Sequence, residues 1–222
     1  MDVNIGKKFQ KIYKMSSYVF DTRAELDKAV SAWINNKTEA TSTYGDINTW
    51  DVSGIKDFSE LFGIHWWKTN FNSDISNWNV SNGTNFSNMF SDTTFNQDIS
   101  SWDVSNGTNF KGMFARSEFG SNYGIYQPKY HDISNWDVSN GTDFSYMFQD
   151  TYVHSKLGNW DVSNGTNFKG MFYEASFDND IGIGNWNVSN GTNFSYMFVD
   201  STFNQDISSW DVSNGTNFKK ML

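Results

Sequence analysis

The sequence predicts a repeat solenoid of seven coils, each about 24 residues long. Residues 77–113 match residues 185–221 at all but four positions, so one unit recurs along the chain. A shorter unit, Trp-Asp/Asn-Val-Ser, recurs at spacings of 28, 24, 34, 24, 26 and 24 residues. A period of this length is typical of arrays in which each coil contacts only its neighbours. The tryptophans of this unit are Trp50, Trp78, Trp102, Trp136, Trp160, Trp186 and Trp210.

Within each coil the apolar pattern changes from period two to helical spacing, as the third coil illustrates. At 99–104, Ile-x-x-Trp-x-Val predicts a short strand with Trp102 and Val104 facing inward. An Asn-Gly turn signal follows, and Phe-x-x-Met-Phe at 110–114 then has the spacing of one helical or 3-10 turn. We therefore expect a short parallel β-strand and a helical or 3-10 turn in each coil, with the tryptophans and phenylalanines in the core.

The N-terminal part of the chain differs from the repeats. Residues 1–20 form a basic tail, and residues 21–44 contain a capping helix over 21–36. Thr22 and Glu25 have the spacing of a capping box, and the apolar residues that follow line one helix face. Such a helix protects the otherwise exposed apolar end of a repeat array. Residues 45–222 are the repeat solenoid, with its last coil incomplete.

Charge and composition exclude several classes of function. The chain has 16 Lys and Arg against 25 Asp and Glu, a net charge of −9. Nucleic-acid binding depends on neutralising phosphates, so we expect no nucleic-acid partner. Without cysteine there is no disulfide framework or thiolate metal site. No apolar run is long enough for a signal peptide or a membrane span, which favours an intracellular location, or an assembled particle, over the cell surface.

Two insertions interrupt the period, one at 115–130 and one at 64–68. Both follow the predicted helical turn, so we expect them to protrude from the same edge of the solenoid. Aromatic side chains on such loops are candidates for a contact with a protein partner, although they could instead pack against their own coil. The predicted partner-binding residues are Trp66, Trp67, Tyr123, Tyr126 and Tyr130.

The residue after each tryptophan of the unit faces outward and is Asp or Asn. Stacked carboxylates about 4.8 Å apart repel one another. Hydrogen bonds from the neighbouring turn, a bound Ca²⁺ or a basic partner would offset this repulsion. A threonine follows the glycine in most coils and so forms an evenly spaced column. An ice-binding surface is therefore an alternative. The carboxylates of this polar column are Asp51, Asp103, Asp137, Asp161 and Asp211.

The last coil stops halfway, without a polar capping segment. We expect Phe218, Met221 and Leu222 to form an apolar end through which the chain pairs with a second copy or another protein.

The repeat unit resembles a known family. Phe-Asn-Gln-Asp-Ile-Ser-Ser-Trp-Asp-Val-Ser at 95–105 and Asp-Phe-Ser-Tyr-Met-Phe at 143–148 are similar to the BspA-like surface-protein repeats, a divergent leucine-rich-repeat family. The resemblance covers about 44–222. It implies an α/β leucine-rich-repeat-like solenoid used in adhesion or protein contact, without catalysis or cofactor. The chain departs from the family in having Gly in place of an aliphatic residue before Thr-Asn-Phe, and its ladder Asn falls at a different offset.

No catalytic or metal-ligand pattern is present in the sequence. His65, His131 and His154 have no ligand spacing, and no nucleophile elbow or phosphate-binding loop occurs. We therefore expect neither an enzyme nor a metal site. The sequence predicts a scaffold for recognition, adhesion or assembly, with a calcium-dependent or ice-binding repeat surface as the alternative.

Overall fold

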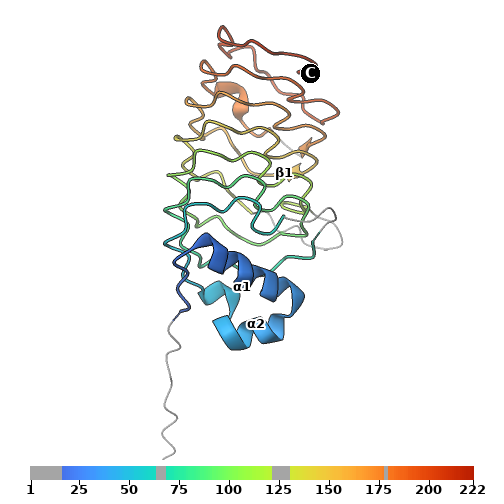
Figure 1. Ribbon diagram of the computed structural model, residues 1–222. Helices are drawn as coiled ribbons and strands as arrows, with labels where there is room; N and C mark the ends of the chain where they lie inside the picture. The colour runs from blue at the N-terminus through green and yellow to red at the C-terminus, as the bar shows by residue number, and fades with distance from the viewer. Residues whose placement is uncertain (1–16, 64–68, 122–130, 178–179) are drawn as a thin grey trace, which may run out of the picture.

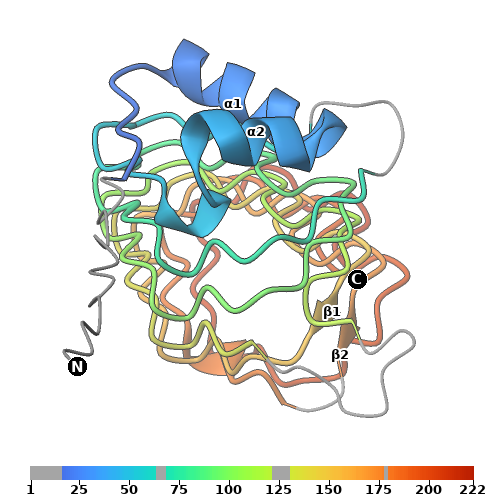
Figure 2. The same cartoon turned by 90° about the horizontal axis from the view of Figure 1, so that it is seen from below.

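The computed structural model describes residues 17–63, 69–121, 131–177 and 180–222. Two helices lie at one end, and the rest of the chain winds away from them in successive turns toward the C-terminus (Figure 1). Seen along this direction, the windings superpose on one another, and the two helices lie over one side of them (Figure 2).

The first helix, α1 (Arg23–Asn35), begins as its sequence indicates. Thr22 accepts a hydrogen bond from the Glu25 N–H, and the Glu25 side chain accepts one from the Thr22 N–H, which completes the capping box. One face of the helix is buried against the coils. Its buried residues are Leu26, Ala29, Val30 and Trp33.

A second helix, α2 (Lys37–Tyr44), follows after a single residue. Asn36 ends α1 because its backbone, at φ −151° and ψ 84°, is not helical. Its side chain then accepts a hydrogen bond from the Glu39 N–H and so caps α2. The sequence pattern predicts one helix over 21–36 and does not reveal α2, because α2 buries only Ala40 and has no apolar stripe.

The last residues of the predicted basic tail, which was expected to run to residue 20, pack against the first coil. Val19 forms a parallel bridge with Asp51, and the Phe20 N–H donates to the Asp51 carbonyl at 3.0 Å. Phe20 is fully buried. Residues 1–16 lie outside the described residues.

The windings contain little regular secondary structure. The strands β1 (Tyr152–Val153) and β2 (Ser176–Phe177) pair in parallel, and two 3-10 turns, η1 (Ile47–Thr49) and η2 (Ile183–Asn185), precede tryptophans. Elsewhere in the described residues, neighbouring coils are joined by single parallel bridges. One column of these bridges runs through Asp57, Asn85, Asn109, Asp143, Asn167, Asn193 and Asn217.

The strand expected at 99–104 is absent, because the bridge of that coil lies later, at Asn109. Two turns explain the difference. The Trp102 N–H donates to the Ile99 carbonyl at 3.1 Å, and the Gly107 N–H donates to the Val104 carbonyl at 2.7 Å. These donors are satisfied within their own coil and are not available to pair with a neighbour.

Pairing between coils occurs instead in the segment that was expected to be a helical turn. The Met113 N–H does close a turn onto the Phe110 carbonyl, at 3.1 Å. The N–H groups of Phe110, Gly112 and Phe114 all donate to the next coil. Each coil therefore combines a tight turn with a parallel ladder in one segment.

Aromatic columns form the core, as the pattern predicts. Trp136 stacks on Trp160 with ring centroids 6.5 Å apart, and Phe144 stacks on Phe168 at 5.7 Å. Each buried tryptophan removes roughly 150–250 Å² from water, which is worth several kcal/mol at about 25 cal/mol per Å². Stacking of like on like therefore contributes to the contact between neighbouring coils.

Part of the predicted insertion at 115–130 belongs to this core. Phe119 is buried and stacks on Phe95, with centroids 6.5 Å apart, and on Phe114, at 4.2 Å. It continues the column that Phe71 and Phe95 begin. The expectation that the whole segment protrudes is therefore wrong for residues 115–121.

Candidate interaction surfaces

All five aromatic residues predicted to contact a partner lie outside the described residues. They are Trp66, Trp67, Tyr123, Tyr126 and Tyr130.

The predicted polar column is held by turn hydrogen bonds. In each coil an Asp or Asn accepts a hydrogen bond from the backbone N–H of the Ser two residues later. For Asp137 and Asp161 these bonds measure 3.0 and 2.9 Å. Of the three possible offsets to carboxylate repulsion, the structure contains the turn hydrogen bonds. The same bond is made by Asp51, Asn79, Asp103, Asn187 and Asp211.

These hydrogen bonds favour the ionised carboxylate. The hydroxyl and backbone N–H of Ser139 lower the pKa of Asp137, and those of Ser163 do the same for Asp161. Ser53 likewise lowers the pKa of Asp51. These three carboxylates therefore stay negatively charged to lower pH than free aspartate would.

An asparagine ladder is present, although the unusual offset of its Asn had put it in doubt. The Asn of each Asn-Gly pair donates its side-chain N–H to the carbonyl of the Ser in the preceding coil. Asn164 donates to Ser139 at 2.8 Å, and Asn190 donates to Ser163 at 2.7 Å. The ladder links the turns of neighbouring coils. Its other members are Asn82, Asn106, Asn140 and Asn214.

A second ladder, made by tryptophan side chains, was not anticipated. The indole N–H of Trp160 donates to the Ile133 carbonyl at 3.0 Å, and that of Trp186 donates to the Leu157 carbonyl at 2.9 Å. The Ile-x-x-Trp spacing carries the signal, since the acceptor is the Ile, or Leu, of the preceding coil. Buried tryptophans thus satisfy their one donor between coils.

Glycine replaces an aliphatic residue in the repeat because a phenylalanine ring occupies the space. A Cβ at Gly141 would meet the ring of Phe144 and would lie 2.9 Å from the Val138 carbonyl oxygen. The backbone there is not left-handed, so the constraint is packing alone. In the first coil the corresponding residue is Ile55.

In the five coils between residues 86 and 200, two positions hold the backbone in the left-handed region. The first lies two residues after the first Phe of Phe-x-x-Met-Phe, and the second lies four residues further on. At the first position Gly112 and Gly170 have φ of 58° and 57°, whereas Tyr146 and Tyr196 have 57° and 60°. A bulky residue at positive φ is uncommon and costs about 1–3 kcal/mol. Tyrosine thus stands where glycine would be unstrained.

Side chains at and beside these positions form three rows, which we call the striped face. Backbone hydrogen bonds fix the rows, since the Tyr146 N–H donates to the Lys169 carbonyl and the Asp150 N–H to the Tyr173 carbonyl, both at 2.8 Å. The basic row is Lys111, Lys169 and Lys219, which alternate with Ser145 and Ser195, and the acidic row is Asp150, Glu174 and Asp200. In the sequence of each coil, Tyr146, Tyr173 and Tyr196 fall between the two rows, and Lys220 takes the tyrosine position in the last coil.

Contacts between the rows show that they share one face. The Lys169 ammonium lies 5.5 Å from the centre of the Tyr146 ring, and the Lys219 ammonium lies 5.6 Å from that of Tyr196. A hydrogen bond with Lys219 lowers the pKa of Tyr196. Hydrogen bonding to Glu174 raises the pKa of Tyr173, and nearby Asp200 and Tyr146 add to that rise. The sequence signal, which we missed, is the alternation of Phe-Lys-Gly with Phe-Ser-Tyr.

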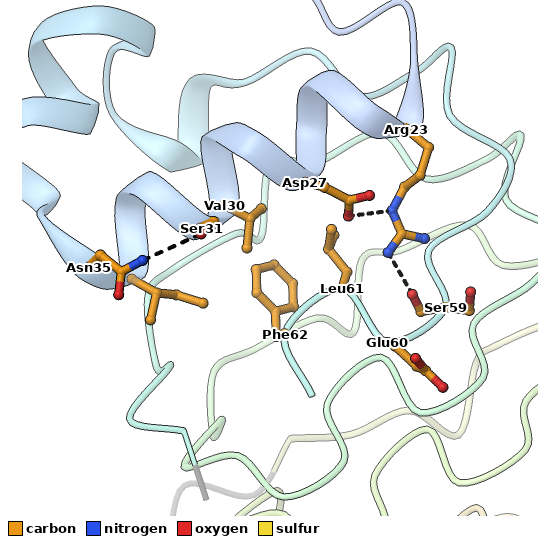
Figure 3. A pocket seen from close by; sticks show the side chains of 10 residues that line it. Arg23, Asp27, Val30, Ser31, Asn35, Ser59, Glu60, Leu61 and Phe62 are labelled. Carbon is orange, nitrogen blue, oxygen red and sulfur yellow. Dashed lines mark hydrogen bonds and ion pairs between the residues drawn. The ribbon is translucent and has the colours of Figure 1, made fainter. Parts of the chain in front are cut away.

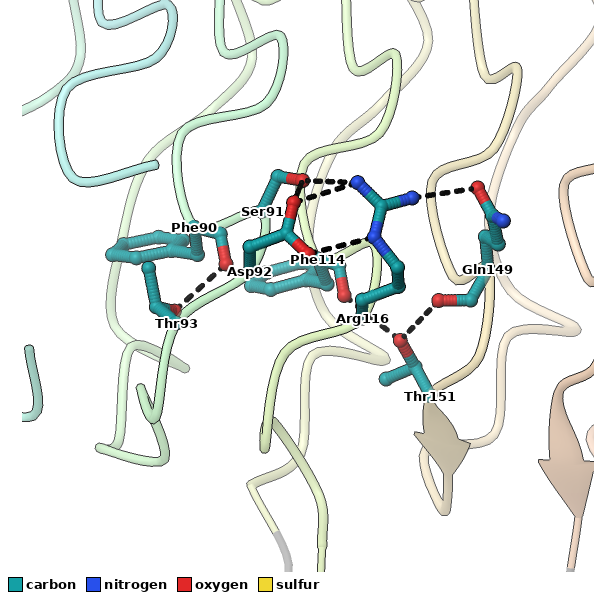
Figure 4. A network of polar contacts seen from close by, with 8 residues as sticks. All are labelled: Phe90, Ser91, Asp92, Thr93, Phe114, Arg116, Gln149 and Thr151. Atoms are coloured by element: carbon teal, nitrogen blue, oxygen red, sulfur yellow. Dashed lines mark hydrogen bonds and ion pairs between the residues drawn. The ribbon is translucent and has the colours of Figure 1, made fainter. Parts of the chain in front are cut away.

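An arginine joins three coils at the lower end of the acidic row (Figure 4). Arg116 makes a bidentate ion pair with Asp92, at 2.7 and 2.6 Å, and donates to the Gln149 side chain at 3.2 Å. Such fork-shaped pairing is geometrically specific. It neutralises Asp92 and leaves Asp150, Glu174 and Asp200 as the negative part of the row.

A cavity of about 600 Å³ lies between α1 and the turn at 59–62 (Figure 3). Arg23 donates to Asp27 at 2.7 Å and to the Ser59 carbonyl at 2.6 Å, so it ties the helix to the turn. Val30, Ile34, Leu61 and Phe62 give the cavity an apolar part, which suits an apolar side chain from another molecule. Its other lining residues are Ser31, Asn35 and Glu60.

A smaller cavity of about 400 Å³ brings together His131 and His154, which the sequence analysis regarded as unclustered. His131 is buried and donates from Nε2 to the Asn96 carbonyl at 3.0 Å. Asp132 and Lys156 also line the cavity. Among the described residues, no three His, Asp or Glu side chains are placed to hold a metal ion. His65 lies outside the described residues.

The predicted apolar end is exposed to different degrees. Phe218 is 40% exposed and Leu222 is 81% exposed, whereas Met221 is partly buried against the core. No helix in the described parts of the chain is both long and apolar enough to span a membrane.

Comparison with known proteins gives one family. Its model, described as "Mycoplasma protein of unknown function, DUF285", matches residues 35–130, 126–183 and 152–222. The three matches together run from residue 35 to residue 222, so one family pattern recurs within the chain. No curated protein and no solved structure matches.

Proposed function

We propose that this chain, which belongs to the DUF285 family of Mycoplasma proteins of unknown function, is a non-enzymatic scaffold for protein recognition, adhesion or assembly. Its fold class, in this proposal, is an α/β leucine-rich-repeat-like solenoid of the BspA-like kind. The surfaces offered for contact are the aromatic insertions, the Asp column and the striped face.

The observation that supports the proposal most is that side-chain hydrogen-bond donors link each coil to the preceding one. Tryptophan and asparagine side chains donate to the preceding coil, and so does Thr166, whose hydroxyl donates to the Thr142 carbonyl at 3.2 Å. These groups build a regular column and repeat the same outer groups along it. A long periodic surface of this kind suits contact with another macromolecule.

Site-specific photo-crosslinking in the source cell tests the proposal. A photoreactive residue replaces Lys169 on the striped face, Asp161 on the polar column or Asp27 beside the cavity, each in a separate variant. We expect at least one position to give a discrete protein adduct while the others do not. Adducts from none of the three positions would contradict contact through these surfaces, and the same smear from all would contradict specific recognition. If the insertion loops form the contact, Trp66→Ala with Trp67→Ala abolishes the adduct.

The calcium-dependent or ice-binding alternative predicts a different result. A calcium-dependent surface requires the melting temperature to fall when EGTA is added, and an ice-binding one requires altered ice crystal shape. The scaffold proposal expects neither change.

A further inference from the structure

We propose that the striped face pairs with the striped face of a second copy of this chain, side by side and with both chains running in the same direction. The inference rests on the proposed function, since it names a partner for the scaffold. Four observations support it: the separated charges, the strained tyrosines, their contacts with lysine and the placement of Arg116.

The charges on this face are separated into parallel rows. In the coils from 144 upward, Lys169 and Lys219 lie on one side of the tyrosines, and Asp150, Glu174 and Asp200 lie on the other. The three acidic side chains are exposed. Arg116, which takes the corresponding position in the coil before Asp150, is already engaged by Asp92 and Gln149. The rows above it therefore keep opposite signs.

This charge pattern selects one symmetry. A two-fold axis parallel to the stacking direction places the basic row of one copy opposite the acidic row of the other. A two-fold axis that crosses the rows would place like charges together. The first arrangement is isologous and closed, as in most homodimers. It sets Lys169 of one copy opposite Glu174 of its partner, at the same height in the stack.

The tyrosines would fill the centre of such an interface. Tyr146 lies across Gly170 of the next coil, with the Lys169 ammonium 5.5 Å from its ring centre. Tyr146 and Tyr196 are each half-buried in the single chain and keep a left-handed backbone that glycine would adopt without strain. Residues held in strained conformations cluster at functional sites, and tyrosine is enriched at the centres of interfaces.

Charge exchange between two variants tests the pairing. One variant carries Lys169→Glu and Lys219→Glu, and the other carries Asp150→Lys, Glu174→Lys and Asp200→Lys. Molar mass is measured by sedimentation at about 0.1 M and about 1 M salt, where charges are screened beyond about 10 Å and about 3 Å. We expect wild type to dimerise at the lower salt and to dissociate at the higher. Each variant alone stays monomeric, and an equimolar mixture forms a heterodimer.

Two controls separate the surface from the fold. Asp103→Lys, Asp137→Lys and Asp161→Lys make the same charge change on the polar column and should leave the dimer intact. Tyr146→Gly with Tyr196→Gly removes the tyrosine rings from the proposed interface, so it should weaken dimerisation more than tenfold. The same change relieves backbone strain, so the melting temperature should not fall. Circular dichroism confirms that every variant folds.

A wild-type chain that stays monomeric at low salt overturns self-pairing, and so does a mixture of the two variants that remains monomeric. Either result leaves the scaffold proposal standing, because a photo-crosslink from Lys169 to a different protein would then identify the striped face as its contact. Adducts with a second copy of this chain alone, with dimerisation retained, would instead overturn recognition of other proteins and leave the pairing intact.

Discussion

At Gly141 the fold has no room for a side chain. The ring of Phe144 covers the Cα, and the Val138 carbonyl oxygen lies 2.9 Å from where a Cβ would stand. We expect Gly141→Ala to lower the free energy of unfolding by about 1–3 kcal/mol, the usual cost of overpacking. Urea denaturation measures this loss.

Two further variants identify the cause. Gly54→Ala is a matched control, because Gly54 is exposed and its Cβ would be 3.4 Å from the nearest atom. It should change stability by less than about 0.5 kcal/mol. Phe144→Met in the Gly141→Ala background should recover part of the loss. If the two costs simply add, the phenylalanine ring is not the source of the clash.

The aspartates of the polar column make the fold sensitive to acid. Ser139 and Ser163 lower the pKa of Asp137 and Asp161 below the ordinary value of 3.8. Near that pH the unfolded chain binds more protons, so this stability is present above about pH 4 and is lost as pH falls through the lowered pKa. We expect the melting temperature to fall below pH 3.8, and to fall less for Ser139→Ala with Ser163→Ala. An equal fall in both chains would show that other carboxylates control acid unfolding.

Single residues also show what the sequence could reveal. The capping box at Thr22 and Glu25 depends on a local spacing, and it is present in α1. The contact between Lys169 and Tyr146 joins residues in different coils, so it depends on the register between them. Local patterns predict the first kind of contact, and the second requires a structure.

At the scale of the elements, we expect mutations in the tryptophan ladder to reduce stability strongly. Trp160→Phe removes the donor that bonds the Ile133 carbonyl at 3.0 Å in a buried position. Leaving a buried polar group unsatisfied costs about 1–3 kcal/mol, in addition to lost ring contacts. We expect Trp160→Phe to destabilise more than Trp33→Phe does. The Trp33 indole bonds the Ser73 hydroxyl at 2.9 Å in a partly buried position, where the hydroxyl can turn toward water. Equal losses would contradict a special role for the ladder.

In the structure, turns occupy the segment predicted to be a strand, and pairing between coils occurs in the segment predicted to be a helical turn. The hydrogen bonds of the backbone explain this difference. Alternation at 99–104 indicates which side chains face inward, and Trp102 and Val104 are indeed buried. It does not indicate where backbone donors go. Turns consume the donors of Trp102 and Gly107, so the parallel bridge forms at Asn109.

For the whole molecule, stacking of each coil on its neighbours predicts how mutations combine. Phe144 stacks on Phe168, so Gly141→Ala and Gly165→Ala disturb one shared contact. We expect their effects on unfolding free energy to depart from additivity by more than about 0.5 kcal/mol. Gly107→Ala and Gly191→Ala lie further apart and should add within that limit. Urea denaturation of both double variants decides, and the reverse ranking would show that strain spreads beyond neighbouring coils.

The repeated units, the helical cap and the aromatic core could be predicted at this scale because each rests on spacing along the chain. Contact sites could not. The five aromatic residues singled out lie outside the described residues. The alternation of Phe-Lys-Gly with Phe-Ser-Tyr marks the striped face in the sequence, but the contacts between its rows depend on how the coils are aligned in space.

The hydrogen bonds of the asparagine ladder also affect how fast these asparagines deamidate. Asn-Gly is the dipeptide most prone to deamidation, in which the Gly nitrogen attacks the Asn side-chain carbonyl, and asparagine is among the thermolabile residues. Here the Gly107 N–H bonds the Val104 carbonyl at 2.7 Å, and the Asn106 amide bonds the Ser81 carbonyl at 2.7 Å. Both reacting groups are thereby held in place. Deamidation at the six Asn-Gly pairs should therefore await unfolding, so that the lifetime of the folded state sets the chemical lifetime of the chain.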